Sequence, residues 1–90
     1  MDLIPRQRID KWLWHARVVR TRHAAADLAV SGHVRLNGLR IDAASRAVRA
    51  GDVVTIALDQ RVRVLRVLGL AERRGSAAAA RDLYEDVVTE

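Results

Sequence analysis

The pair Asn37-Gly38 lies between two short alternating segments, H-V-R-L before it and L-R-I after it. A two-residue turn of this composition accepts positive φ angles at both positions, as a type I′ β-hairpin requires. Two strands joined in this way are antiparallel neighbours. The pair therefore predicts a hairpin and, with it, an antiparallel sheet.

The segment before the hairpin has the period of helices. Apolar residues recur there at helical spacing: Ile9, Trp12, Leu13 and Ala16. This spacing predicts an amphipathic helix over residues 8–19, with Trp12 in the core. Thr21 is a good N-cap for a second helix, and Gly32 fits the end of that helix. We expect a tight turn to join the two helices.

The segment after the hairpin predicts two more strands. Residues 43–52 are expected to form a loop that a Gly51-Asp52 turn closes, and residues 53–58 alternate as a strand. An Asp59-Gln60 turn then leads into a return strand. Two valines of that strand share a face with an arginine, so we expect a bulge near Leu65 to restore the apolar face.

The last segment predicts a third helix. Ser76 can cap it, and its apolar stripe would be Ala80, Leu83, Tyr84 and Val87. The order α-α-β-β-β-β-α predicts an α+β fold, with two N-terminal helices packed on a small, mostly antiparallel four-strand sheet. Ninety residues make one domain. We expect residues 1–71 to form its body and residues 72–90 to form a C-terminal helix or tail, packed on that body or extending from it.

Charge is concentrated in the first part of the chain. The formal net charge is +5, and residues 1–71 carry 13 cations against six carboxylates, whereas residues 72–90 carry a net −2. Basic charge gathered on one part of a small domain is typical of a nucleic-acid binder. A solvated surface with incidental charge is the other interpretation.

The sequence contains no pattern typical of an active site or a cofactor site. Without cysteine it has no disulfide, thiol nucleophile or Cys-based zinc site, which agrees with a cytoplasmic location. The three histidines lack metal-site spacing and are expected to be solvated or to face phosphate: His15, His23 and His33. We expect no enzyme activity, no metal, no cofactor and no membrane segment.

The first two helices could present a binding surface. The N-terminus of the second helix would offer unsatisfied amides beside Arg20 and Arg22. Trp14 could stack on an unpaired base, which favours RNA, or pack against the C-terminal helix. Arg17 could contact phosphate or form an ion pair with Asp10 or Asp27. The expected RNA contacts are Arg8, Lys11, Trp14, Arg17, Arg20, Thr21, Arg22, His23, Arg35, Asn37 and Arg40.

Residues 8 to about 58 resemble a known RNA-binding family. The matching pieces are R-I-D from Arg8, T-R-x-x-A from Thr21, G-x-V from Gly32, Asn37-Gly38 and Gly51-Asp52. Together they resemble the S-four domain, or alpha-L motif, first seen in small-subunit ribosomal protein four. The runs K-W-L-W-x-A-R and A-E-R-R-G-S-A-A-A-A-R-D-L-Y-E are similar to the ribosome-associated heat-shock protein fifteen family.

This resemblance implies a function. It implies a stress-associated ribosome rescue or quality-control factor that binds large-subunit ribosomal RNA on free or stalled large subunits, with transfer RNA as a further possible contact. Members usually continue into a long basic extension, whereas the last residues here are acidic. We expect a monomer.

Two alternatives come from other classes. One is a regulatory or interaction module that uses this fold to bind DNA or protein. The other is a domain appended to an RNA-modifying enzyme, which we discount because the 90 residues leave no room for a catalytic domain.

Overall fold

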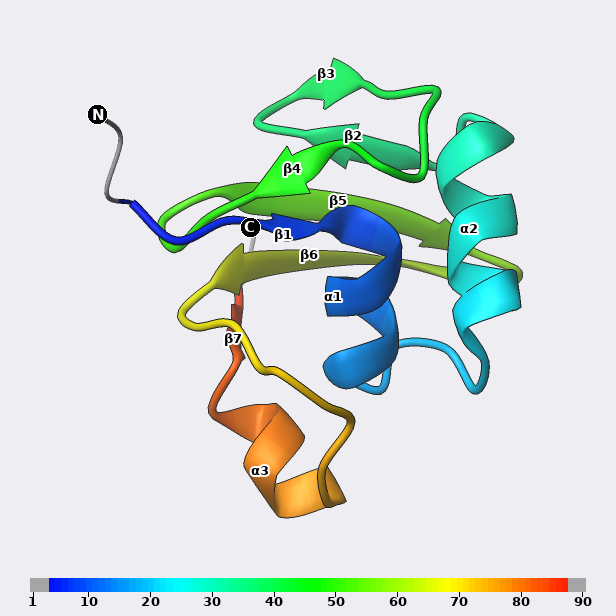
Figure 1. Cartoon of the computed structure of the whole chain (residues 1–90). Helices are drawn as coiled ribbons and strands as arrows, with labels where there is room; N and C mark the ends of the chain where they lie inside the picture. The colour runs from blue at the N-terminus through cyan, green and yellow to red at the C-terminus, as the bar shows by residue number, and fades with distance from the viewer. Residues whose placement is uncertain (1–3, 88–90) are drawn as a thin grey trace.

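The computed structural model describes residues 4–87, and Figure 1 shows how their elements are arranged. In chain order these are β1 (Gln7–Arg8), α1 (Ile9–His15), α2 (Arg22–Val30), β2 (Val34–Leu36), β3 (Leu39–Arg40), β4 (Ala47–Val48), β5 (Val53–Leu58), β6 (Arg61–Val67), α3 (Ala77–Arg81) and β7 (Tyr84–Asp86). An antiparallel sheet has the order β3-β2-β5-β6-β7, and β1 pairs with β4 separately. In Figure 1, α1 lies in front of the strands with α2 beside it, and α3 lies below the sheet. The expected α+β fold is confirmed, with five strands in the main sheet rather than four.

The hairpin forms where the sequence predicts it. Asn37 has φ 52° and Gly38 has φ 83°, and Leu36 pairs with Leu39 across the turn. Both positive angles match a type I′ turn. The side chain of Asn37 also ties the turn to β5, because its Oδ1 accepts a hydrogen bond of 2.8 Å from the backbone N–H of Val53.

The core lies where α1 and α2 meet the sheet. Its most buried large side chains come from both layers: Ile9, Trp12, Leu13, Val34, Val54, Ile56 and Leu65. Trp12 is fully buried, as predicted, and its indole N–H donates to the carbonyl of Gly69 at 3.0 Å. The one polar group of that ring is therefore satisfied inside the core.

Helix α1 is shorter than predicted. It ends at His15 rather than at residue 19, because Arg17 adopts φ 58° and turns the chain away from the helix axis. The N–H of Val18 bonds to the carbonyl of Leu13, and the N–H of Arg17 bonds to that of Trp14. These two bonds form a Schellman ending, in which glycine is the usual left-handed residue. The connection to α2 then runs from residue 16 to 21, longer than a tight turn.

Residues 43–52 are more than a loop. They contain β4, whose Ala47 pairs with Arg8 and whose Val48 pairs with Gln7 of β1. Val48 is buried in the core. The expected simple loop is therefore wrong, since this segment secures the chain just before α1.

The predicted bulge near Leu65 is also wrong. The register between β5 and β6 is continuous from Val53 opposite Arg66 to Leu58 opposite Arg61. Leu65 faces the core together with Val67, and alternation places Arg63 on the same face. The guanidinium of Arg63 lies 5.3 Å from the ring centre of Tyr84, and its Nη2 lies 3.3 Å from a carboxylate oxygen of Asp86. These partners on β7 accommodate a cation that would otherwise disrupt the apolar face.

The C-terminal segment forms a short helix and a strand. The hydroxyl of Ser76 caps α3 as predicted, accepting from the N–H of Ala79 at 3.1 Å. The helix ends at Arg81, however, and Tyr84 pairs with Val67 in the sheet. The predicted helical stripe is therefore wrong beyond α3, because β6 offers its free edge to this part of the chain.

Candidate nucleic-acid interface

A buried carboxylate of α1 holds two basic side chains, Arg8 of β1 and Arg22 of α2. Asp10 is 3% exposed, and its two oxygens accept hydrogen bonds of 3.1 and 3.0 Å from Nε and Nη2 of Arg8. Its Oδ2 also lies 3.7 Å from Nε of Arg22. The side chains of Arg8 and Arg22 are 49% and 45% exposed. One carboxylate therefore holds two half-exposed guanidinium groups together, and their combined charge stays positive.

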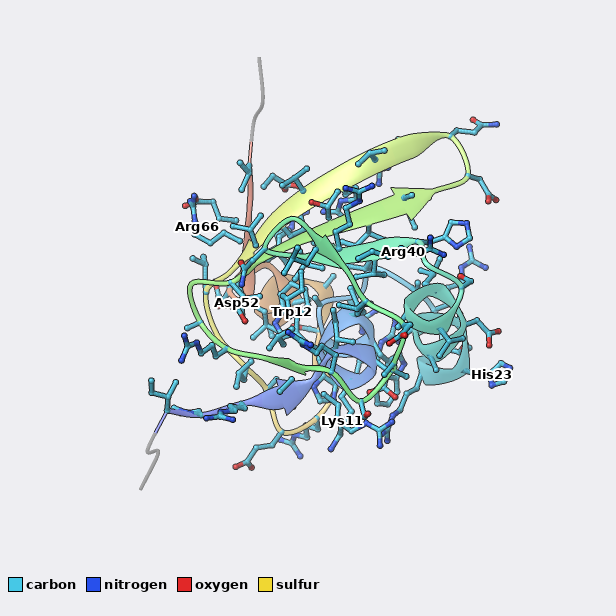
Figure 2. The ribbon with its side chains drawn as sticks, turned by 90° about the horizontal axis from the view of Figure 1, so that it is seen from above. Lys11, Trp12, His23, Arg40, Asp52 and Arg66 are labelled. Carbon is cyan, nitrogen blue, oxygen red and sulfur yellow. The ribbon has the colours of Figure 1, made fainter. Side chains whose placement is uncertain are left out.

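The start of α2 lies beside this pair. Thr21 is the N-cap, and its Oγ1 accepts from the N–H of Ala24 at 3.0 Å. Arg20, Thr21 and His23 are exposed, and His23 Nε2 lies 3.4 Å from Asp27 Oδ2. In Figure 2, His23 points away from α2, and Lys11 points away from α1. The helix start thus combines free amides with nearby cations, which suits a phosphate group.

Trp14 and Arg17 face residues 69–75, a segment that we term the strap. Arg17 donates through Nε and Nη2 to the carbonyl of Gly75, at 3.1 and 2.7 Å. Arg74 donates to the carbonyl of Trp14, and its guanidinium lies 5.8 Å from a ring centre of that tryptophan. The ion pair considered for Arg17 with Asp10 or Asp27 is not formed, and Trp14 contacts Arg74 of the strap, which precedes α3.

His15 differs from its expected role. It is 1% exposed, whereas the sequence suggested a solvated or phosphate-facing ring. Burial lowers the pKa of His15, and the charges of Lys11 and Arg22 act in the same direction against a hydrogen bond to the backbone of Ala71. The lowered pKa favours the neutral form of the buried ring, so His15 is not one of the cations of this surface.

The remaining expected contacts lie on the β2–β3 hairpin, which follows α2 in the chain. Arg35 pairs with Arg40 across the two strands. The guanidinium of Arg40 lies against the backbone of Gly32, where a Cβ atom would clash with it. The amide of Asn37 is engaged by Val53 and by Asp52. The expected residues therefore fall into two groups, one on the helices and one on the hairpin.

Three arginines outside the expected set lie near Asn37. Arg6, Arg46 and Arg49 line a hollow of about 350 Å³ together with Asn37. The charged run S-R-A-V-R contains two of them. Arg46 and Arg49 lie beside Arg6 because β1 pairs with β4. Local sequence does not predict this pairing.

Within residues 4–87, no cluster of three or more histidine, aspartate or glutamate side chains could hold a metal ion. The helices of this part of the chain are also too short and too polar to cross a membrane.

The sequence is similar to proteins of known families. The S4 domain family matches residues 7–54. A heat shock protein 15 homolog from Aeromonas salmonicida is 43% identical over 79 residues, which are 88% of this chain and 59% of that protein. Heat shock protein 15 from Escherichia coli K12 is 35% identical with the same coverage. Small ribosomal subunit protein uS4 from Paracoccus denitrificans is 42% identical over 69 residues, 74% of this chain and 34% of that protein.

A solved structure is similar to this one over a larger part of the chain than the sequence matches cover. The trimeric structure of Vibrio cholerae heat shock protein 15 superposes with a TM-score of 0.85 at 30% identity, covering 92% of this chain and 83% of that chain. The chain spans 59% of the length of the heat shock protein 15 relatives named above. The resemblance seen in the sequence is confirmed. The chain therefore belongs to the S4 domain family and, within it, to the heat shock protein 15 proteins.

Proposed function

We propose that this chain is a non-catalytic RNA-binding protein of the cytoplasm. The observation that carries the proposal is the arginine pair that Asp10 holds beside the start of α2. Arg8 and Arg22 present fixed, half-exposed guanidinium groups, which suit bidentate contact with phosphate. Membership of the S4 domain family supports RNA as the nucleic acid.

The partner within this proposal is ribosomal RNA of the large subunit. The chain would act there as a stress-associated rescue or quality-control factor, on free or stalled subunits. The similarity to heat shock protein 15 proteins and to a ribosomal protein supports this assignment. Transfer RNA held on such a subunit is a further contact within the proposal.

Co-sedimentation with separated ribosomal subunits tests the partner. We expect the chain to pellet with large subunits and to remain in the supernatant with small subunits. Equal pelleting with both, or with neither, would contradict the large-subunit assignment.

Titration of an RNA hairpin and a DNA duplex of equal length tests the chemistry. We expect tighter binding to RNA, with log affinity falling against log salt by about 0.7 to 0.9 for each phosphate contacted. Equal affinity for the duplex would favour a general nucleic-acid module. A slope near zero would remove the electrostatic basis of the proposal.

The assembly is tested separately. The sequence leads us to propose a monomer, whereas the Vibrio cholerae relative is described as trimeric. Light scattering at the concentrations used for RNA binding distinguishes a mass near 10.0 kDa from three times that mass.

A further inference from the structure

The hollow between β1, β4 and the β2–β3 turn has a basic wall. Arg6, Arg46 and Arg49 line it together with Asn37 and Asp52. Its volume of about 350 Å³ lies within the roughly 300–1,000 Å³ of typical ligand sites. None of the described residues in its wall is aromatic, so the wall offers no ring on which a base could stack. The hollow therefore suits an anion better than a base.

Two of these arginines are accessible and have no acidic partner. Arg46 and Arg49 are exposed, and neither forms an ion pair with an acid of residues 4–87. The buried side chains in the same wall are apolar, Leu36 and Val48. A ligand that enters from solvent can therefore reach both guanidinium groups without a change in the fold.

Asp52 is the acid among the described residues of the wall, and its carboxylate is already engaged. Oδ1 accepts from the side-chain amide of Asn37 at 3.1 Å, and Oδ2 accepts from the backbone N–H of Arg49 at 3.0 Å. The carboxylate thereby ties the β2–β3 turn to the segment that carries Arg49. Its single negative charge is outweighed by Arg46 and Arg49 alone, so the wall keeps a net positive charge.

The hollow also continues the surface proposed for RNA. Arg8 of that surface pairs with Ala47 of β4, and Ala47 lines the hollow. Directly opposite residues of an antiparallel pair have Cα atoms about 4.5–5.5 Å apart. The N–H of Ile9 also donates to the carbonyl of Arg46 at 2.8 Å, and Figure 1 shows β4 alongside β1. An RNA strand that contacts Arg8 can therefore reach the hollow with a neighbouring phosphate.

We propose that this hollow binds a phosphate group of the bound RNA through the guanidinium groups of Arg46 and Arg49. Arginine suits this role because its planar guanidinium donates two parallel hydrogen bonds to a phosphate. The proposal rests on the proposed RNA-binding function and extends the RNA path from α1 and α2 across the β1–β4 pair. Contacts of this kind position the RNA without reading its sequence.

RNA titration of the double variant Arg46→Ala, Arg49→Ala tests the site. The variant loses both guanidinium groups but keeps the backbone N–H that Asp52 binds. We expect its RNA affinity to fall at least tenfold, and its salt dependence to fall by about one unit for the lost phosphate contact. The loss should be the same for RNA hairpins with different loop sequences. Affinity equal to that of the parent would overturn the proposal.

The double variant Arg61→Ala, Arg81→Ala is the matched control. It removes the same charge at two exposed positions outside the hollow, and neither arginine has an ion pair with an acid of the described chain. Both double variants should melt like the parent, because exposed charges contribute little to stability. The control should bind RNA within about twofold of the parent, since it keeps every proposed phosphate contact. Equal losses of affinity in the two variants would mean that total charge decides, and the proposal would fail.

Nitrogen-15 NMR of the arginine Nε–H groups locates the ligand. The single variants Arg46→Ala and Arg49→Ala assign the two signals. We expect an RNA hairpin to shift both signals saturably, and inorganic pyrophosphate to shift them with weaker affinity. A shift with pyrophosphate but none with RNA would mean that the hollow takes a free anion, which overturns the assignment to RNA. No shift with either would overturn the site itself.

RNA binding by the parent separates this proposal from the proposed function. If the parent and the Arg46→Ala, Arg49→Ala variant bind RNA equally well, only the proposal for the hollow falls. If the parent binds no RNA, the proposed function falls, and the hollow has no RNA phosphate to receive.

Discussion

At the scale of single residues, the buried carboxylate of Asp10 holds two arginines of the basic surface in place. Its carboxylate lies below two guanidinium groups and also accepts from the backbone N–H of Lys11 at 2.8 Å. Removing it would raise the net charge by one, which by itself favours binding to RNA. It would also release Arg8 and Arg22 from their fixed positions. The two effects on RNA affinity oppose each other, so a substitution can separate them.

We expect Asp10→Asn to lower the free energy of unfolding by about 1.5–3 kcal/mol, the range for hydrogen bonds to charged groups. The lower end is favoured because the two arginines are half exposed and can be rehydrated. RNA affinity should not rise, despite the added positive charge. Urea denaturation and RNA titration measure the two quantities.

Asp42→Asn is the matched control, because it makes the same charge change at an exposed loop position. Its stability should stay within about 0.5 kcal/mol of the parent. If Asp10→Asn instead unfolds at the same urea concentration as the parent and binds RNA more tightly, Asp10 does not organise the surface.

His15 makes stability depend on pH. Burial lowers its pKa in the folded state below the ordinary histidine value of about 6.5, so the unfolded chain takes up a proton more readily. The stability from its neutral form is complete above the unfolded pKa and is lost as the pH falls below it. We expect the unfolding midpoint to drop between pH 7.5 and 5.5.

Replacing His15 and His23 one at a time shows which histidine causes the pH dependence of stability. His15→Gln should flatten this pH dependence, whatever its effect on stability at pH 7.5. His23→Gln, at an exposed site, should retain the parent's dependence. A parent midpoint that is constant over this range would contradict the assignment.

At the scale of elements, the β2–β3 hairpin can be tested through its turn. Gly38 has φ 83° and no other group within 4 Å of where a Cβ would lie. A side chain there would be strained by its backbone conformation and would meet no neighbour. We expect Gly38→Val to cost roughly 1–3 kcal/mol of stability, because β-branched residues strongly disfavour positive φ.

Gly38→Asn serves as the control, since asparagine tolerates the left-handed conformation far better. It should lose much less stability than the valine variant in urea denaturation. Equal losses in the two variants would mean that something other than φ decides stability at this turn.

The accuracy of the sequence predictions depends on how local each signal is. Both helix caps, Thr21 and Ser76, and the turn at Asn37-Gly38 are correct because each acts within three or four residues. Strands β1, β4 and β7 are not predictable in this way, because segments of two or three residues have no period and depend on distant partners. The end of α1 is not predictable either, because arginine is not a residue that favours the positive φ angle found at position 17.

The site is predictable to a similar extent. The basic residues on α1 and α2 are evident because they cluster in sequence. The pairing of Arg8 and Arg22 through Asp10 needs the packing of two helices, which the sequence does not specify. The burial of His15 likewise depends on the strap, more than 50 residues away along the chain.

At the scale of the whole molecule, one short segment supplies both the core and the proposed binding surface. Leu13 is fully buried on α1, whereas Arg20 and Arg22 are exposed at the start of α2. Figure 2 shows this division at Trp12, which lies inside the molecule, and at Lys11, which points outward. Stability and RNA affinity should therefore respond to different substitutions.

We expect Leu13→Ala to lower stability by about 2–5 kcal/mol, as large-to-small changes in a core do. A small domain has only about 5–15 kcal/mol in total, so this variant can unfold. The double variant Arg20→Ala, Arg22→Ala should keep its stability within about 1 kcal/mol. It should bind RNA more weakly, and its salt dependence should fall by about one unit for each phosphate that it no longer binds.

The double variant Arg61→Ala, Arg66→Ala removes the same charge from β6 and serves as the control. Figure 2 shows Arg66 well away from Lys11 and His23, so a specific surface on α1 and α2 should lose little affinity in this variant. Melting curves and RNA titrations at two salt concentrations compare all three variants with the parent. If both double variants weaken binding equally, total charge rather than the helical surface governs affinity. If only the β6 variant weakens binding, the RNA lies across the sheet and the surface assigned to α1 and α2 is wrong.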